Sequence, residues 1–192
     1  KVRIQDPKAI IHALDKEDIN IIYTRHYHEY DNYFYFDKKR EGRLRYREDE
    51  FVGKKGEVTN VRSRLTLVGQ SREGSLDRDV MLSRARYYAP ATHSLRFYRE
   101  YFDPARELEI EKDRLRWKIQ YDGFDFHINL DTLIKPDLGH FLEVKSRTWS
   151  LKDAELKSQK IAEIIDYLGA SSEKAEIRDY AEIVDSFIKN NH

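Results

Sequence analysis

Basic side chains occupy alternate positions in four separate segments of this chain. The segments are 43–47 (RLRYR), 62–66 (RSRLT), 112–118 (KDRLRWK) and 143–147 (EVKSR). In a β-strand, alternate side chains lie on opposite faces, so each segment would carry its cations on one face. Arginine and lysine bind phosphate oxygens. A triphosphate, with several negative charges in a row, is therefore a natural ligand for such strands.

In three of the four segments the other face carries Leu, Tyr, Trp or Val, which favours burial in a core. If the strands share one sheet, their cationic faces align, and a closed barrel would direct them inward at a polyanion. The alternative is a set of solvated faces whose Lys and Arg protect sheet edges. Four such segments in one small domain favour the barrel. Buried cations repel one another, so they require an anion or acidic partners.

The composition excludes several classes of protein. Among 192 residues, Lys plus Arg and Asp plus Glu are both 35, and this zero net charge argues against a protein that coats duplex DNA. The absence of cysteine excludes disulfides, thiolate zinc sites and a catalytic thiol. No segment reads as a membrane span or signal peptide, so we expect a cytoplasmic protein that does not bind membranes. The first residue is Lys, and we expect a domain of a longer protein.

The periodicity predicts a single α+β domain over residues 1–192, built around an antiparallel sheet. Strands are expected at 1–4, 19–37, 43–47, 58–69, 107–121, 124–133 and 141–147. A short helix is expected after Asp6-Pro7, since Asp suits the N-cap and Pro the first helical position. Residues 70–107 are expected to form a mixed, largely helical insert, and 150–190 a pair of C-terminal helices.

Each C-terminal helix has an apolar stripe that predicts its buried face. The stripe of the first helix, entered at Ser150, contains Leu156, Ile161, Ile164, Ile165 and Leu168. The stripe of the second, expected from Glu173 to Lys189, contains Ile177, Tyr180, Ile183, Val184 and Phe187.

Several motifs, in order along the chain, resemble those of the CYTH superfamily, the triphosphate tunnel metalloenzymes, which include class IV adenylyl cyclases and thiamine triphosphatases. The motifs are YFD at 35–37, LRYR at 44–47, LTLVG at 65–69, EKDR at 111–114, LD at 130–131 and LGHFLE at 138–143. The C-terminal helix pair also fits. The resemblance covers most of the chain outside residues 70–107. It implies a closed antiparallel β-barrel, the tunnel, with flanking helices and a triphosphate bound inside.

The resemblance also implies roles for individual residues. Those expected to hold phosphate oxygens and to offset charge during phosphoryl transfer are Arg45, Arg47, Lys112 and Arg114. Further substrate-binding residues are expected to be Lys1, Arg43, Arg64, Arg116 and Lys145. Glu143 is the expected ligand of Mg²⁺ or Mn²⁺, hard cations that take carboxylate oxygens. Asp131 is expected either to contact the metal ligand without binding the metal itself or to orient one of the arginines.

The sequence departs from the family pattern at the metal site. The family's first strand carries Glu-x-Glu-x-Lys, and Lys1 matches its lysine, which would place both acids before the first residue. Val68 replaces a family lysine, and Lys145 replaces an acid of the closing strand. The alternative role for Glu143 is to neutralise nearby cations such as Lys145 or Lys112.

Two functional hypotheses follow. The first is a metal-dependent phosphohydrolase that cleaves inorganic, nucleotide or thiamine triphosphate; a nucleotidyl cyclase is less favoured. The second is a non-catalytic tunnel domain of a larger protein that binds a polyphosphate, a nucleotide or the 5′-triphosphate end of RNA. Separately, His26 and His28 have a spacing that can bind zinc, but no acid is clearly placed to complete that site.

Overall fold

The computed structural model describes residues 1–16, 19–37, 42–68 and 87–191, which form one antiparallel sheet flanked by helices. The α+β class is thus confirmed. The strands are β1 (Val2–Ile4), β2 (Asn20–Tyr35), β3 (Arg43–Val52), β4 (Val58–Val68), β5 (Tyr87–Pro90), β6 (Arg106–Tyr121), β7 (Phe124–Lys135) and β8 (Gly139–Lys145). The helices are α1 (Pro7–Leu14), α2 (Leu95–Phe102), α3 (Leu151–Tyr167) and α4 (Tyr180–Asn190), with a 3₁₀ turn at Ser172–Lys174.

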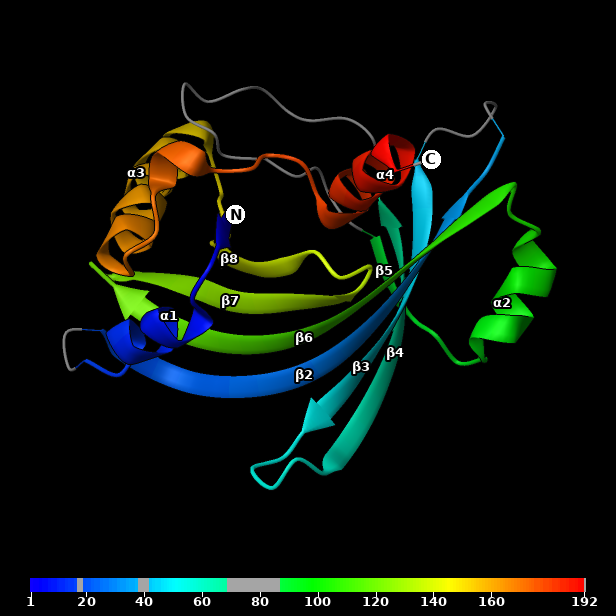
Figure 1. Cartoon of the computed structure of the whole chain (residues 1–192), viewed down its shortest axis with the longest axis horizontal. Coiled ribbons are helices and arrows are strands. Elements are labelled where there is room, and N and C mark those ends of the chain that lie inside the picture. Colours follow the sequence, from blue (N-terminus) through cyan, green and yellow to red (C-terminus); the bar gives the residue numbers. More distant parts are fainter. Residues whose placement is uncertain (17–18, 38–41, 69–86, 192) are drawn as a thin grey trace.

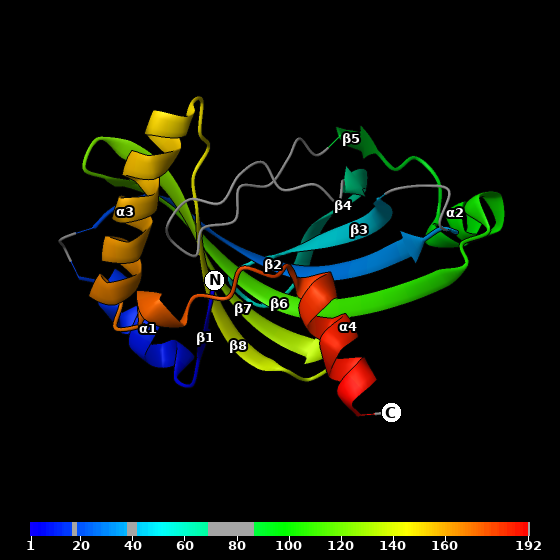
Figure 2. The same cartoon turned by 90° about the horizontal axis from the view of Figure 1, so that it is seen from above.

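The sheet is strongly curved, and α4 lies on its concave side (Figure 1, Figure 2). The strand order is β1-β8-β7-β6-β2-β3-β4-β5. Within the described residues the edge strands β1 and β5 do not pair with each other, so hydrogen bonds do not close the predicted barrel. Both edges are short, with three residues in β1 and four in β5, and they offer few backbone groups for a closing ladder.

The two long strands at the centre of the sheet set the register of the concave face. β2 and β6 each have sixteen residues and pair along most of their length. β6 returns as β7 through Asp122 and Gly123, whose positive φ values of 49° and 79° suit a two-residue hairpin turn. The predicted hairpin is confirmed, and its register places Arg114 opposite Asp131.

Helices cover the convex face, where the apolar side chains of the basic segments lie. Trp117 of β6 is 5% exposed and belongs to a core that includes residues of α1 and α3. Tyr46 of β3 packs on Tyr98 of α2, with ring centroids 5.8 Å apart. The predicted division of these strands into an apolar face and a basic face is therefore confirmed.

Several predicted elements differ from the structure. Of the insert at 70–107, residues 70–86 lie outside the described residues, and the remainder contains β5, α2 and the start of β6 rather than mostly helix. The second C-terminal helix begins at Tyr180, because a capping box formed by Asp179 and Glu182 sets its start.

Three residues of the predicted stripes are exposed against expectation, since Leu156 is 41%, Ile177 37% and Phe187 40% exposed. None of the described helices is long and apolar enough to cross a membrane.

Candidate phosphate-binding site

The concave face collects basic side chains from β3 and β6. Arg45 and Arg47 of β3, and Lys112 and Arg114 of β6, are each no more than 7% exposed. The members of each pair are two residues apart, so strand alternation puts both on one face. β2 lies between β3 and β6 and separates the two pairs. The structure thus brings together the four residues predicted to hold phosphate; their part in catalysis stays a prediction.

The central strand β2 supplies a buried carboxylate, Asp31, that was absent from the predicted site. Arg47 donates two hydrogen bonds to Asp31, from Nε to Oδ1 and from Nη2 to Oδ2, both 2.6 Å long. Lys112 Nζ donates a third to Oδ2, also at 2.6 Å. Burial alone would raise the pKa of Asp31, but the charges of Arg47 and Lys112 lower it far below its ordinary value.

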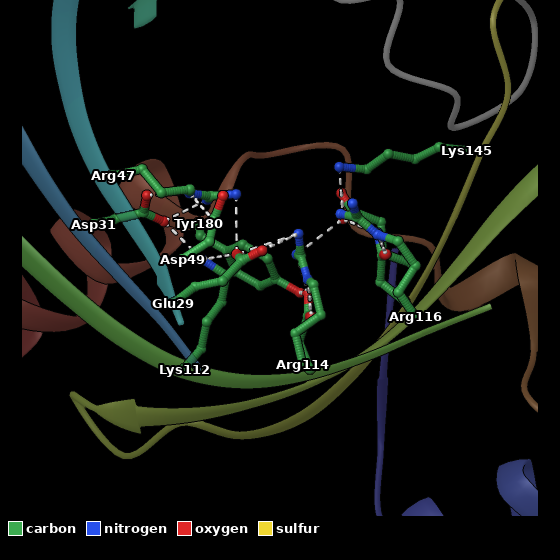
Figure 3. A network of polar contacts seen from close by, with 12 residues as sticks. Glu29, Asp31, Arg47, Asp49, Lys112, Arg114, Arg116, Lys145 and Tyr180 are labelled. Atoms are coloured by element: carbon green, nitrogen blue, oxygen red, sulfur yellow. Dashed lines mark hydrogen bonds and ion pairs between the residues drawn. The ribbon is translucent and has the colours of Figure 1, made fainter. Parts of the chain in front are cut away.

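Glu29, two residues earlier on β2, joins the two basic pairs (Figure 3). Its Oε2 lies 2.9 Å from Arg47 Nη1, 3.0 Å from Lys112 Nζ and 3.3 Å from Arg114 Nη1. Burial would raise the pKa of Glu29, but the charges of Arg114 and Arg47 hold it well below its usual range. Glu29 and Asp31 are therefore the acidic partners that buried cations require.

Asp131 of β7 orients one arginine, as one of its two predicted roles requires. Arg114 donates from Nε to Oδ1 at 2.5 Å and from Nη2 to Oδ2 at 2.6 Å. The hydroxyl of Tyr180, the first residue of α4, donates to Oδ2 at 2.5 Å. Burial and the negative charge of Asp131 raise the pKa of Tyr180 well above its ordinary value. The start of α4 is thus fixed to the floor of the site.

Glu143 of β8 lies among cations and not beside other carboxylates. Its Oε2 is 2.7 Å from Lys145 Nζ and 3.5 Å from Arg114 Nη2, and its Oε1 is 3.9 Å from Lys1 Nζ. Asn129 Nδ2 donates to Oε2 at 3.2 Å. Burial would raise the pKa of Glu143, but the charges of Lys145 and Lys1 hold it well below its usual range. This environment matches the alternative role, neutralisation of neighbouring cations.

The residues around Glu143 do not fit the predicted Mg²⁺ or Mn²⁺. A divalent cation takes several oxygen ligands, and the three cations around this carboxylate would repel it. Asp131 already binds Arg114 and Tyr180. In the described part of the chain, no three His, Cys, Asp or Glu side chains are arranged to hold a metal. A metal at Glu143 stays a prediction without support from these contacts.

The other predicted binding residues lie around the edge of this network. Arg64 of β4 donates to Asp49 Oδ2 at 2.7 Å, and Arg43 of β3 pairs with Asp179 at the start of α4. Burial lowers the pKa of Arg64, and so do the charges of Arg62, Arg47 and Arg45.

Towards the opposite end of the face, Arg116 donates from Nε to Asn129 Oδ1 at 2.7 Å. Lys1 Nζ lies 5.2 Å from the centroid of the Tyr180 ring.

A small cavity of about 50 Å³ lies between this face and α4. It is lined by Lys1, Tyr33, Arg45, Arg47, Val68, Arg114, Glu143, Lys145, Asp179 and Tyr180. Five of these side chains are cationic and two are carboxylates, so the lining carries an excess of positive charge.

The histidines considered as a zinc site lie on the convex face. His26 Nε2 is 2.7 Å from Asp113 Oδ1, and His28 Nε2 is 3.0 Å from Glu111 Oε1. Each histidine therefore pairs with its own acid on the neighbouring strand β6. No group of three or more potential ligands forms there among the described residues, so the structure offers no zinc site at this position.

The lowered pKa values of Glu29, Asp31 and Glu143 predict that the fold loses stability in acid. Each carboxylate stabilises the fold fully above its unfolded-state pKa of about 4, and this contribution is lost as the pH falls through the lower folded-state pKa. Urea unfolding should give a free energy that declines steadily below about pH 5. A free energy that stays constant from pH 6 to pH 3 would contradict these ion pairs.

No family model and no curated protein matches the sequence. Solved structures share its fold. The PH1819 protein from Pyrococcus horikoshii OT3 has a TM-score of 0.67 at 21% identity, over 95% of each chain. A candidate adenylate cyclase from Vibrio parahaemolyticus has a TM-score of 0.63 at 16% identity, over 96% of this chain and 94% of its own.

A conserved hypothetical protein from Pyrococcus furiosus has a TM-score of 0.58 at 16% identity, over 94% of this chain and 95% of its own. At these identities the likeness establishes the fold alone. The chain shares a fold, over nearly its whole length, with a candidate adenylate cyclase, and this is consistent with the CYTH-like fold that the motifs predict.

Proposed function

We propose that the concave face binds the oligophosphate group of a small molecule, such as inorganic triphosphate, a nucleoside triphosphate or thiamine triphosphate. The observation that carries this proposal is the incomplete hydrogen bonding of Arg45. Its guanidinium is buried against the cavity, yet its Nε has no hydrogen-bond partner among the residues that the structure describes. A buried donor without a partner costs roughly 1–3 kcal/mol, which a phosphate oxygen would offset.

The contacts of Arg45 are weaker than those of its neighbours. Its Nη2 donates to Thr66 Oγ1 at 3.4 Å, and its Nε lies 3.6 Å from Asp31 Oδ1. Arg47 and Arg114, in contrast, each bind a carboxylate through two short hydrogen bonds. Arg45 is thus the cation of this set that is most available to a ligand.

The electrostatics around Arg45 also favour an anion. The cavity lining has more cations than carboxylates, and Arg64, one strand further out, has its pKa lowered partly by three neighbouring arginines. A positive potential inside a low-dielectric recess attracts and concentrates anionic ligands. Oligophosphate, which carries several charges in a short length, would satisfy this excess.

The cavity of about 50 Å³ leaves little room for a triphosphate between its walls. One wall is the sheet, and the other includes Asp179 and Tyr180 at the start of α4. We therefore propose that ligand entry separates the start of α4 from the sheet. The bonds that would open are Arg43 to Asp179 and Tyr180 to Asp131.

Turnover of the bound triphosphate, by hydrolysis or by cyclisation of a nucleotide, is a second candidate function, since the chain shares its fold with a candidate adenylate cyclase. The four buried cations would hold phosphate oxygens and offset charge in the transition state. The 5′-triphosphate end of an RNA is a further ligand of the same chemistry. The contacts of Glu143 do not supply the metal site that such a reaction generally uses, so we place binding before turnover.

The proposal predicts that tripolyphosphate stabilises the protein. A ligand at about 100 times its dissociation constant adds about 2.7 kcal/mol to the free energy of unfolding. We expect a raised melting temperature with tripolyphosphate or ATP, and no comparable rise with sulfate at matched ionic strength. Equal effects of tripolyphosphate and sulfate would contradict the proposal. Phosphate release measured with and without Mg²⁺ or Mn²⁺ then separates turnover from binding alone.

A further inference from the structure

A second group of basic residues lies on the concave face, beyond Arg114 and away from the cavity. Arg116 and Lys118 continue the alternate positions of β6, and Arg25 of β2 pairs directly with Arg116. In the next row, Lys118 pairs with His127 of β7, and His127 pairs with Lys145 of β8. Basic side chains thus stand side by side on four neighbouring strands.

Cross-strand neighbours of like charge destabilise a sheet unless an anion lies between them. Arg25 and Arg116 are such neighbours, and neither forms an ion pair with a carboxylate in the described part of the chain. Arg25 instead donates to the Tyr27 hydroxyl at 3.4 Å, and Arg116 to Asn129. Two adjacent guanidinium groups without acidic partners indicate a place for an external anion.

The second row is also short of negative charge. Lys118 binds Asp125, which is half exposed, and Lys145 binds Glu143. His127 contacts only the Tyr23 hydroxyl by hydrogen bond among described residues, at 3.3 Å. Burial lowers the pKa of His127, and the positive charges of Arg116 and Lys118 lower it further.

The basic residues of this second group are linked to the cavity through Lys145. Figure 3 shows Arg116 and Lys145 together at one end of the network, with Arg114 between them and the cluster around Asp31. Lys145 lines the cavity, and its partner Glu143 lies 3.5 Å from Arg114. The carboxylate between the cavity and this second group is Glu143, and Lys145, Arg114 and Lys1 offset its charge.

We propose that Arg25, Arg116, Lys118 and His127 form a second anion subsite, which holds phosphate groups beyond the third in a linear phosphate chain whose end enters the cavity. This inference rests on the proposed function. A phosphate chain fits better than a nucleic-acid strand, because the tyrosine rings of this region are covered by arginines. Arg25 lies 4.5 Å from the centroid of Tyr23, and Arg116 5.3 Å from that of Tyr27. Tyr27 is also buried, so it offers no face on which a base could stack.

The test compares tripolyphosphate with a longer linear polyphosphate by isothermal titration. The variant is R25Q/K118Q, which keeps every residue of the buried network. Arg25 is exposed, and so is Asp125, the carboxylate that Lys118 binds among the described residues. A matched control, K8Q/K152Q, removes the same charge from exposed positions on α1 and α3. We expect the longer chain to bind the wild type about tenfold more tightly, and R25Q/K118Q to lose that advantage, since contacts to charged groups contribute on this scale.

Tripolyphosphate affinity should be unchanged in R25Q/K118Q, and the control should behave as wild type. The salt dependence of polyphosphate binding should also become shallower in R25Q/K118Q. An affinity independent of chain length, or an advantage that survives in R25Q/K118Q, would overturn the second subsite and leave the proposed function standing. Failure of the wild type to bind tripolyphosphate would overturn both. Tighter binding of an RNA with a 5′-triphosphate than of polyphosphate would overturn the choice of ligand.

Discussion

Replacement of Asp31 by asparagine is expected to lower the free energy of unfolding by about 3–5 kcal/mol. Asp31 accepts short hydrogen bonds from Arg47 and Lys112, and all three side chains are buried. Asparagine has nearly the same shape but no charge, so Arg47 and Lys112 would share Glu29 as their remaining close counter-charge. The cost of a buried unpaired charge exceeds that of most single substitutions. Urea unfolding at pH 7 measures the difference.

Glu109→Gln is the matched control for Asp31→Asn. Glu109 also binds a lysine and an arginine, Lys135 and Arg99, but its side chain is 47% exposed. Exposed ion pairs contribute about 0–1 kcal/mol, so this variant should stay close to wild type. Equal losses of unfolding free energy in the two variants would show that burial does not govern the strength of these ion pairs. They would also contradict the view that Asp31 is needed to offset the buried cations.

The basic face was predictable because strand alternation is a local property of the sequence. Arg45 and Arg47 lie two residues apart on β3, as do Lys112 and Arg114 on β6, and any strand conformation puts each pair on one face. Their convergence required only that the strands share a sheet. The apolar positions between them, such as Trp117, identified the opposite face by the same rule.

The acids of the site were not predicted, although a signal existed. Glu29 and Asp31 alternate on β2 just as the arginines do on β3, but tyrosines dominate that segment and indicate a core strand. The contact of Glu29 with Lys112 depends on the β2–β6 register, which joins residues far apart in sequence. The sequence did not predict that Tyr180 belongs to the site, because its hydrogen bond to Asp131 depends on where α4 packs against the sheet.

Closure of the barrel could not be predicted from alternation either. A strand pattern states which face is buried, whereas closure depends on how long the edge strands are and whether they meet. Residues 69–86, between β4 and β5, lie outside the described residues. Among the described residues, β1 pairs with β8 on one side and has an isolated bridge from Val2 to Ala175 on the other. The curvature of the long strands, and not a closing ladder, therefore shapes the concave face.

Arg45→Gln and Glu143→Gln are expected to change tripolyphosphate affinity in opposite directions. Both residues line the same cavity, and both variants place the same side chain there. Loss of Arg45 removes a buried donor to phosphate, and affinity should fall about 10- to 100-fold, the range for hydrogen bonds to charged groups. Loss of the Glu143 charge removes a negative charge from the cavity lining, and affinity without metal should rise about three- to tenfold. Isothermal titration in a chelating buffer measures both.

The opposite signs make this pair of variants informative, because a general loss of folding would weaken binding in both. Glu143→Gln should also lower the free energy of unfolding by about 1–3 kcal/mol, since Arg114 loses part of its counter-charge in a buried site. If Glu143 instead holds Mg²⁺ or Mn²⁺, Glu143→Gln would abolish metal-stimulated phosphate release and leave stability without metal nearly unchanged. If the wild type releases phosphate faster with metal and Glu143→Gln does not, Glu143 is a metal ligand and not a counter-charge. Metal-independent binding that strengthens in Glu143→Gln would establish the carboxylate as a counter-charge, whose removal leaves the cavity more positive for its phosphate ligand.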